Sequence, residues 1–211
     1  MNDIQIIPGI TEKDLEVITK RIKELEKFAE RVHVDIADGK FVGNTTSLGT
    51  SAINTMDTIA EIELHLMVEN PKDFVPSEKG RVTKIISHVE SRDFSREWLE
   101  ELQSLEYEIG IAINPETEIQ SLEPFLEYAN SIQFMTIHPG FAGQKFLPEV
   151  LEKVKEFKKG YPSIPIEIDG GINPETAKLA VSAGATLLVS TSFLEECDDL
   201  KECIRELSNS K

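Results

Sequence analysis

Four residues with metal-binding side chains lie at the predicted C-terminal ends of three strands. His33 and Asp35 occur in RVHVDIADG, His65 in ELHLMV and Asp169 in IEIDGG. Any one histidine at a strand end is more often structural, but two imidazoles and two carboxylates together can hold a divalent cation and leave positions open for a substrate. We therefore predict one divalent metal ion and metal-assisted chemistry. This ligand set favours zinc or iron, with manganese and cobalt as alternatives.

Short apolar runs rich in isoleucine and valine predict the strands that position these residues. Runs of this kind, with turn residues around them, are typical of buried parallel strands. We expect eight strands, at residues 4–7, 32–36, 62–68, 82–86, 109–113, 132–137, 164–168 and 186–189. The segments between them have one apolar and one charged face at helical spacing, as in Leu15, Ile18, Ile22 and Leu25, and in Leu147, Val150, Val154 and Phe157.

Capping residues indicate where several of the helices begin. Thr11 with Asp14 fits a capping box. Three Asn-Pro pairs, at 70–71, 114–115 and 173–174, each place an N-cap residue before a proline in the first turn. Each pair follows a predicted strand after only a few residues, as expected for short strand-to-helix loops.

The repeated strand and helix units predict a (β/α)8 barrel that forms a single domain over residues 1–211. An open, doubly wound sheet is the alternative. In a barrel, reactive groups gather where the strands end and the following loops begin. The four metal-binding residues all fall at such positions.

The composition argues against nucleic-acid and membrane partners. Asp and Glu outnumber Lys and Arg by 38 to 22, which gives a formal net charge of −16 and a surface that repels phosphodiester backbones and anionic lipid. No signal-type N-terminus is seen, and no apolar run approaches the ~18 residues of a membrane span. Cys197 and Cys203 fit neither a redox pair nor a zinc knuckle, so we expect them to be reduced, in a cytoplasmic protein.

Four separated segments resemble the signature segments of the ribulose-phosphate 3-epimerase family, in the same order. They are VHVDIADGKFVGN, LHLMVENP, MTIHPGFAGQKF and IDGGINPET. The resemblance implies a phosphate-binding barrel in which His33, Asp35, His65 and Asp169 bind the metal and in which Asp35 and Asp169 also form the acid/base pair. Family members interconvert D-ribulose 5-phosphate and D-xylulose 5-phosphate, and the resemblance also suggests a homo-oligomer.

The implied reaction explains why these residue types are needed. Removing a proton from a carbon beside a ketone gives an enediolate, whose charge must be stabilised on oxygen before a modest base can act. A divalent cation chelated by the substrate oxygens supplies that stabilisation. Inversion then requires one carboxylate to take the proton from one face and another to return a proton to the opposite face.

Glycine turns are expected to bind the phosphate group of a sugar phosphate despite the acidic net charge. Backbone N–H groups in such turns and at helix N-termini can bind an anion without lysine or arginine. Met67 and Met135 match family positions that line the sugar, although ordinary core packing explains a buried methionine equally well. The predicted substrate-binding residues are Met67, Met135, Gly140, Gly143, Gly170, Gly171 and Ser192.

Departures from the family pattern bear on the substrate rather than on the metal. The family usually has a serine at the position of Gly9, where its hydroxyl approaches the substrate, and a glycine at the position of Thr191. Ala37 replaces a methionine, and His138 replaces an Asn, Asp or Glu. The smaller Gly9 and Ala37 would make room for a longer sugar.

Three alternatives to a ribulose 5-phosphate epimerase follow. One is an epimerase of a hexulose phosphate such as allulose 6-phosphate, and another is a paralogue that binds a phosphorylated sugar without turnover. Related barrels run aldol or decarboxylation chemistry, but these typically need a lysine or an Asp-Lys array at the strand ends, which the sequence does not indicate. His88, at the end of the fourth predicted strand, is expected to support the site rather than to bind the metal.

Overall fold

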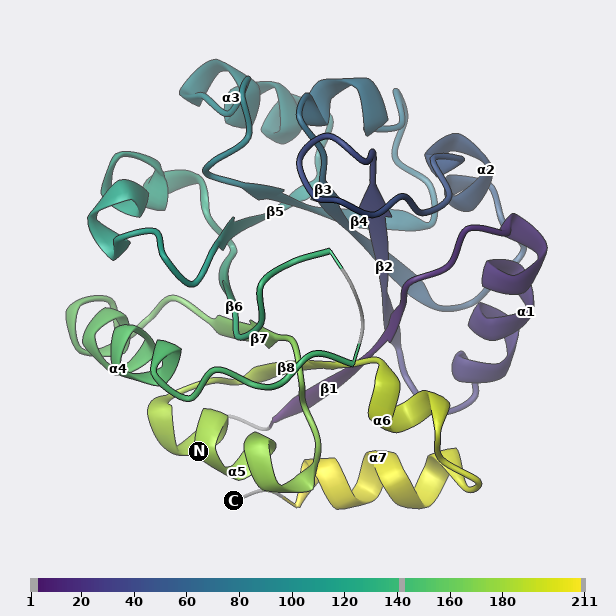
Figure 1. Ribbon diagram of the computed structural model, residues 1–211. Coiled ribbons are helices and arrows are strands. Elements are labelled where there is room, and N and C mark those ends of the chain that lie inside the picture. The colour runs from purple at the N-terminus through teal and green to yellow at the C-terminus, as the bar shows by residue number, and fades with distance from the viewer. Residues whose placement is uncertain (1–3, 141–142, 210–211) are drawn as a thin grey trace.

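The computed structural model describes residues 4–140 and 143–209. Its strands are all parallel and close into one barrel in the order β1 to β8 (Figure 1), which confirms the predicted (β/α)8 architecture and rules out the open sheet. The domain prediction itself, a single unit over 1–211, stays a prediction. The strands are β1 (Gln5–Ile10), β2 (Arg31–Ala37), β3 (Glu61–Met67), β4 (Val82–His88), β5 (Glu108–Ile113), β6 (Ser131–Met135), β7 (Ile166–Asp169) and β8 (Leu187–Ser190).

Helices surround the barrel, but they are unequal in length and type (Figure 1). α2 has five residues, and both η1 and η2 are 3-10 helices, the latter with Pro124 inside it. A proline within a helix removes a hydrogen bond of the α-helical ladder, which explains why the crossover after β5 is not a regular α-helix. The helices are α1 (Leu15–Leu25), α2 (Thr50–Asn54), η1 (Pro71–Phe74), α3 (Arg96–Ser104), η2 (Ile119–Tyr128), α4 (Val150–Gly160), α5 (Pro174–Ala183), α6 (Ser192–Glu195) and α7 (Leu200–Ser208).

The capping predictions were only partly right. Asn173 caps α5 in a capping box with Thr176, as its Asn-Pro pair predicts. Asn114-Pro115 opens only a turn, because the following helix begins later, at Ile119. Thr11 does not cap α1; Asp14 does so alone, by accepting a hydrogen bond from the Glu16 N–H.

Strand β1 is longer than predicted because Pro8 does not end it. β1 pairs with β8 as far as Pro8, opposite Ser190, and pairs with β2 from Gly9, opposite His33. The register therefore carries the inner face of β1 up to the level of the predicted metal ligands.

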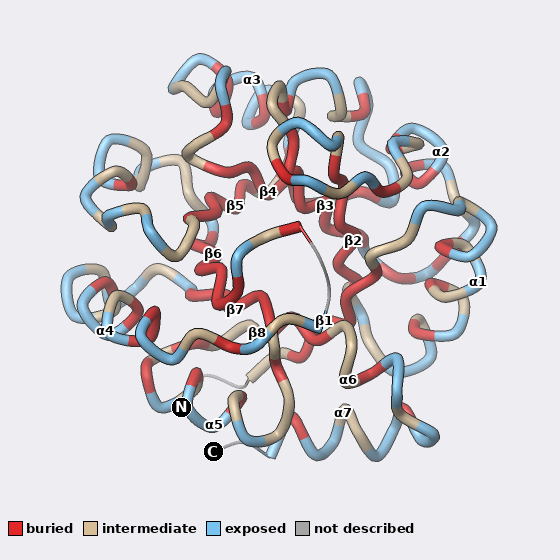
Figure 2. The backbone as a smooth tube through the Cα atoms, viewed as in Figure 1, coloured by how far each residue is buried: buried red, intermediate tan, exposed pale blue. Residues whose placement is uncertain are grey.

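Alternation along the strands separates an apolar shell from a polar barrel interior. On β2, Val32, Val34 and Ile36 belong to the main hydrophobic core, and His33 and Asp35 have the opposite parity. Successive strand residues point to opposite faces, so His33 and Asp35 point into the barrel while the three apolar residues pack toward the helices. Figure 2 shows the strands as a continuous buried ring inside more exposed helices.

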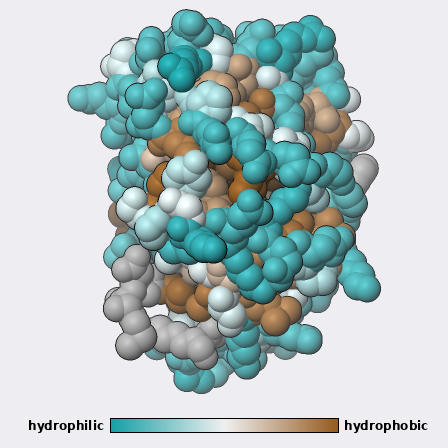
Figure 3. All heavy atoms as spheres, turned by 90° about the vertical axis from the view of Figure 1, so that its left-hand side faces the viewer, coloured by the Kyte–Doolittle hydropathy of each residue, from teal (hydrophilic) through white to brown (hydrophobic). Residues whose placement is uncertain are grey.

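The surface agrees with the acidic composition. On the side that carries α4, hydrophilic side chains predominate and apolar groups show mainly in the recesses between them (Figure 3). None of the helices in the described part of the chain is both long and apolar enough to cross a membrane.

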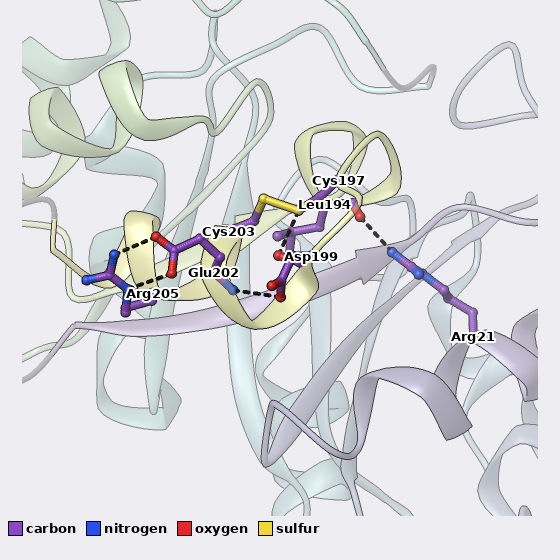
Figure 4. The surroundings of a disulfide bond; sticks show 7 residues. All are labelled: Arg21, Leu194, Cys197, Asp199, Glu202, Cys203 and Arg205. Carbon is purple, nitrogen blue, oxygen red and sulfur yellow. Dashed lines mark hydrogen bonds and ion pairs between the residues drawn. A yellow bond between two sulfur atoms is a disulfide. The ribbon is translucent and has the colours of Figure 1, made fainter.

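The two cysteines are joined in a disulfide, so the expectation that both would be reduced was wrong (Figure 4). Cys197 lies just after α6 and Cys203 lies within α7, six positions later. Asp199 caps α7 between them by accepting a hydrogen bond from the Glu202 N–H. The disulfide closes the loop between α6 and α7, and its two thiols meet only when that loop folds. The spacing of the cysteines therefore resembles neither a redox pair nor a zinc knuckle.

Replacing both cysteines by serine should lower the free energy of unfolding by about 2 kcal/mol, the loop-closure entropy of so short a disulfide loop. Urea denaturation of the double variant and of the wild-type protein measures the difference. Wild-type protein unfolded with a reductant present should match the variant. Equal midpoints for all three samples would mean that the disulfide adds nothing to stability.

Candidate active site

The four predicted metal ligands converge on one centre at the C-terminal ends of β2, β3 and β7. His33 Nε2 lies 3.3 Å from Asp35 Oδ1 and 3.8 Å from Asp169 Oδ2. His65 Nδ1 lies 2.9 Å from Asp35 Oδ1 and 3.4 Å from Asp169 Oδ2. All four side chains are buried. The barrel thus brings together residues that are far apart in the sequence.

The spacing of these atoms fits a divalent cation. Ligands about 2.1 Å from a tetrahedral ion lie roughly 3.4 Å from one another. The four distances between imidazole nitrogens and carboxylate oxygens run from 2.9 to 3.8 Å. The group as a whole offers one ligand atom from each residue within 4.8 Å of the others. These residues could therefore hold one metal ion.

Buried partners orient both imidazoles toward this centre. His33 Nδ1 lies 2.7 Å from Glu63 Oε1, so the proton belongs on Nδ1 and Nε2 faces the carboxylates. His65 Nε2 lies 2.8 Å from His88 Nε2, and His88 Nδ1 lies 3.2 Å from Glu90 Oε2. We assign protons so that His65 Nε2 donates to His88 and His88 Nδ1 donates to Glu90. His65 Nδ1 is then left for the centre, with His88 in the supporting position expected from the sequence.

The electrostatics of the centre favour carboxylates facing protonated imidazoles. Burial by itself lowers the pKa of His33, but hydrogen bonds with Asp35 and Glu63 raise it well above its usual value. The pKa of His65 is likewise lowered by burial and raised, on balance, by Asp169 and Asp35. Burial raises the pKa of Asp35, but hydrogen bonds from both imidazoles bring it far below the ordinary range. A cation would therefore replace protons at this centre.

A second group of buried charges lies below the centre, inside the barrel. Lys84 Nζ lies 3.1 Å from Glu63 Oε2 and also contacts Glu167 Oε2. Burial and the negative charge of Glu63 raise the pKa of Glu167 to about 7. Lys84 offsets the charge of the carboxylate that orients His33. It is buried in its ion pairs with these two carboxylates and does not line the cavity that holds Asp35 and Asp169, so it does not supply the lysine of aldol or decarboxylase chemistry.

Two further residues lie at the centre that neither motif nor spacing predicts. The Thr11 hydroxyl donates a hydrogen bond of 2.6 Å to Asp35 Oδ2, which explains why it does not cap α1. Gln133 Nε2 lies 3.3 Å from Asp169 Oδ2. Strand parity could have found Gln133, since it lies two residues before Met135 on the same face of β6.

All the residues predicted to bind substrate line one cavity of about 510 Å³, open mouth included. Asp35 and Asp169 line the same cavity. Phe141 and Ala142, in the predicted glycine loop, lie outside the described residues. The substrate-binding set that shares the cavity is Met67, Met135, Gly140, Gly143, Gly170, Gly171 and Ser192.

The backbone of the turn after β7 strongly favours glycine. Gly170 has φ +114° and a Cβ there would lie 2.5 Å from Ile137 Cγ1. Gly171 has φ +67° and a Cβ there would lie 3.1 Å from Phe146 Cβ. L-residues rarely adopt such backbone angles, and the tight contacts bring the backbone itself to the cavity wall.

The room expected beside Gly9 and Ala37 is filled. Thr191 Oγ1 lies only 2.0 Å from where a Cβ of Gly9 would be, so the prediction of free space at Gly9 was wrong. Ala37 is buried in a small apolar cluster with Val42 and Met67, and within the described residues it does not belong to the cavity lining. His138 lies at the surface, where it pairs with Glu116, and does not reach the centre.

Fold and site together define a (β/α)8-barrel enzyme with a candidate metal centre where its strands end. The sequence model of the ribulose-phosphate 3 epimerase family matches residues 5–194. The chain belongs to this family and is an enzyme of the isomerase class.

Relatives match over nearly the full chain. The ribulose-phosphate 3-epimerase of Bacillus subtilis (strain 168) is 35% identical over 217 residues, covering 99% of this chain and 100% of its own. The cytoplasmic isoform of ribulose-phosphate 3-epimerase from Oryza sativa subsp. japonica is 35% identical over 214 residues, covering 98% of this chain and 93% of its own.

Solved structures of other enzymes share the barrel. Tryptophan synthase of Mycobacterium tuberculosis superposes with a TM-score of 0.67 at 15% identity, over 99% of this chain and 93% of that one. Orotidine 5'-phosphate decarboxylase of Pyrococcus horikoshii OT3 gives 0.64 at 17% identity, over 98% of each chain. At these identities the likeness shows the fold alone.

Replacing Glu63 by Gln should weaken metal binding by about tenfold or more, because the partner that orients His33 loses its charge. Competition with a chelator measures the dissociation constants for Zn²⁺ and Mn²⁺. Glu61→Gln is the matched control, since Glu61 lies on the same strand but is exposed and pairs with Arg31. The same affinity in both variants would show that Glu63 does not support the metal site.

Metal affinity should fall as pH falls, by up to about tenfold per pH unit for each proton displaced. The raised pKa values of His33 and His65 leave these imidazoles protonated below those values, whereas Asp35, with its lowered pKa, stays ionised. Calorimetry in two buffers of different ionisation enthalpy measures the protons released on binding. An affinity that does not change with pH between mildly acidic and mildly basic solution would contradict the assignment.

Proposed function

We propose that this protein is a metal-dependent ketose-phosphate 3-epimerase that interconverts D-ribulose 5-phosphate and D-xylulose 5-phosphate. The observation that carries the proposal is that Asp35 and Asp169, from β2 and β7, line one cavity and share one centre with two imidazoles. The names of the relatives, ribulose-phosphate 3-epimerases, support the choice of substrate.

His33, Asp35, His65 and Asp169 would hold the divalent cation. When bound, the cation supplies electrostatic stabilisation for negative charge that develops on the substrate oxygens. Two nitrogen and two oxygen donors favour zinc or iron, and manganese or cobalt would also fit such a set.

Asp35 and Asp169 would move the proton between the two faces of the sugar. Asp35 Oδ1 faces the two imidazoles, and Oδ2 accepts the hydrogen bond from Thr11. Asp169 uses Oδ2 toward the imidazoles and Gln133. In one direction Asp35 takes the proton from carbon three while Asp169 gives one to the opposite face, and the roles exchange in the reverse direction.

The other end of the cavity suits a phosphate group. Within the described residues its lining includes no Lys or Arg, and the glycine turn after β7 adjoins Ser192 in the first turn of α6. N–H groups in a first helical turn lack partners within the helix, and amides of glycine turns can likewise point at an anion. We infer that Gly140, Gly143, Gly170, Gly171 and Ser192 bind the phosphate by backbone and hydroxyl groups, so the net charge of −16 is no obstacle.

The cavity favours a five-carbon sugar over a six-carbon one. Thr191 occupies the space that a glycine at residue 9 would otherwise open, and Ala37 is covered by its apolar neighbours. Met67 and Met135 line the same cavity as the two carboxylates, where their thioethers would keep water from the reacting carbon. A paralogue that only binds a sugar phosphate would have no use for two carboxylates at one centre. We also infer a cytoplasmic location, because charged sugar phosphates do not cross a bilayer unaided, and, from membership of the family alone, a homo-oligomer.

A deuterium-exchange experiment tests the substrate. The protein is loaded with Zn²⁺, Fe²⁺, Mn²⁺ or Co²⁺ and incubated in D₂O with a panel of pentulose and hexulose phosphates. NMR should show deuterium entering at carbon three of ribulose 5-phosphate. Exchange on a hexulose phosphate alone would overturn the substrate assignment, and no exchange with any metal would favour a non-catalytic binder.

Asp35→Asn and Asp169→Asn should each lower kcat by several orders of magnitude, because each removes a group that transfers a proton in the reaction. Circular dichroism should show that both variants are folded. Asp73→Asn, a change of the same type at an exposed site in η1, is the control. Turnover near the wild-type rate in either active-site variant would remove that residue from proton transfer.

A further inference from the structure

The side chain of Thr191 fills the place where a side chain of residue 9 would lie. A Cβ built on Gly9 falls 2.0 Å from Thr191 Oγ1 and 3.2 Å from Thr191 Cβ. The two residues face each other across the β1 and β8 pairing, one position beyond Pro8 and Ser190, which are in register. Residue 9 and residue 191 therefore share one side-chain volume, and only one of them can use it.

The Thr191 hydroxyl is not used by the fold. Thr191 is the N-cap residue of α6, a position where a threonine hydroxyl commonly accepts a hydrogen bond from a backbone N–H of the first turn. Here no side-chain cap forms, and the hydroxyl has no hydrogen-bond partner within the described residues. The residue lines the cavity that holds Asp35 and Asp169. A polar group at this place is available to a ligand.

The position of Thr191 points to the sugar chain rather than to the phosphate. Thr191 directly precedes Ser192, which belongs to the proposed phosphate end, and both residues line the cavity that holds Asp35 and Asp169. The neighbouring position, Gly9, is in register with His33 of the metal centre. Thr191 thus lies between the metal centre and the proposed phosphate end.

We propose that the Thr191 hydroxyl hydrogen-bonds a hydroxyl oxygen of the sugar chain, and that it does so in the volume where a serine at residue 9 would place its own hydroxyl. The proposal rests on the proposed function, because it names a contact of the same substrate. Gly9 and Thr191 are then a matched pair in which the hydroxyl comes from the residue that follows β8 instead of from β1. The glycine at residue 9 and the threonine at residue 191, which both differ from the family pattern, thus compensate for each other.

Thr191→Val tests the contact, since valine keeps the shape and removes the hydroxyl. We expect kcat/KM for ribulose 5-phosphate to fall roughly threefold to tenfold, the effect of one neutral hydrogen bond, with an unchanged melting temperature. Thr191→Ser should recover most of the loss. Inhibition by inorganic phosphate should keep its wild-type constant in both variants.

An exchange of the two residues tests the shared volume. Gly9→Ser alone should lower the melting temperature and the activity, because its Cβ meets Thr191, and Thr191→Gly alone removes the hydroxyl. The double variant, Gly9→Ser with Thr191→Gly, should have a higher melting temperature and a higher activity than either single variant. If the double variant has no higher kcat/KM than Thr191→Gly alone, a hydroxyl at residue 9 does not replace the one at residue 191, and the proposal of a shared volume is overturned.

The outcomes separate this contact from the proposed function. A wild-type protein that turns over no ketose phosphate overturns the proposed function and the contact together. An active wild type whose Thr191→Val variant keeps its full kcat/KM overturns the contact alone. A loss of affinity for inorganic phosphate equal to the loss in kcat/KM would place the hydroxyl on the phosphate and also contradict the proposal.

Discussion

The site depends on holding two carboxylates and two imidazoles within a few ångströms of one another in a buried place. Unpaired buried charge is costly, so the arrangement survives only because each group has a partner. Glu63 accepts a hydrogen bond from His33, His88 accepts one from His65, and Thr11 donates one to Asp35. The polar interior of the barrel, with Lys84 between Glu63 and Glu167, stabilises this arrangement from below. A cation would complete it by replacing the protons that now separate nitrogen from oxygen.

The barrel makes this arrangement possible by geometry rather than by local sequence. Parallel strands end at a common rim, so side chains from β2, β3 and β7 meet although they are far apart in the chain. The apolar residues on the opposite strand faces, such as Val32 and Val34, pack in the core toward the helices and hold the strands in place. One rim thus carries the candidate metal centre, and the glycine turn after β7 adjoins it along the same cavity. This division between a packed outer shell and a polar interior is what lets a small enzyme keep its chemistry buried and accessible at one end.

Periodicity predicted the strands and residue type predicted the four centre residues, because both can be seen in a short stretch of sequence without knowing what folds against it. The eight strands were found within a few residues of their observed bounds. What the sequence could not show were contacts that form only when the chain folds: the Thr11 bond to Asp35, the buried pairing of Lys84, and the disulfide. Thr11 fitted a capping pattern and Lys84 was one charge in an apolar run, so each had an ordinary local explanation. The space beside Gly9 was misjudged for the same reason, because Thr191, which fills that space, follows β8 and is far from Gly9 in the sequence.

We expect turnover to require one cation at His33, Asp35, His65 and Asp169. The most direct test removes all metal from the purified protein and adds Zn²⁺ or Fe²⁺ back in small steps while the epimerisation rate is followed. The expected rate is near zero in the metal-free protein, rises linearly as the ion is added, and reaches a plateau at one ion per chain. A metal-free protein that epimerises at the full rate would contradict this expectation.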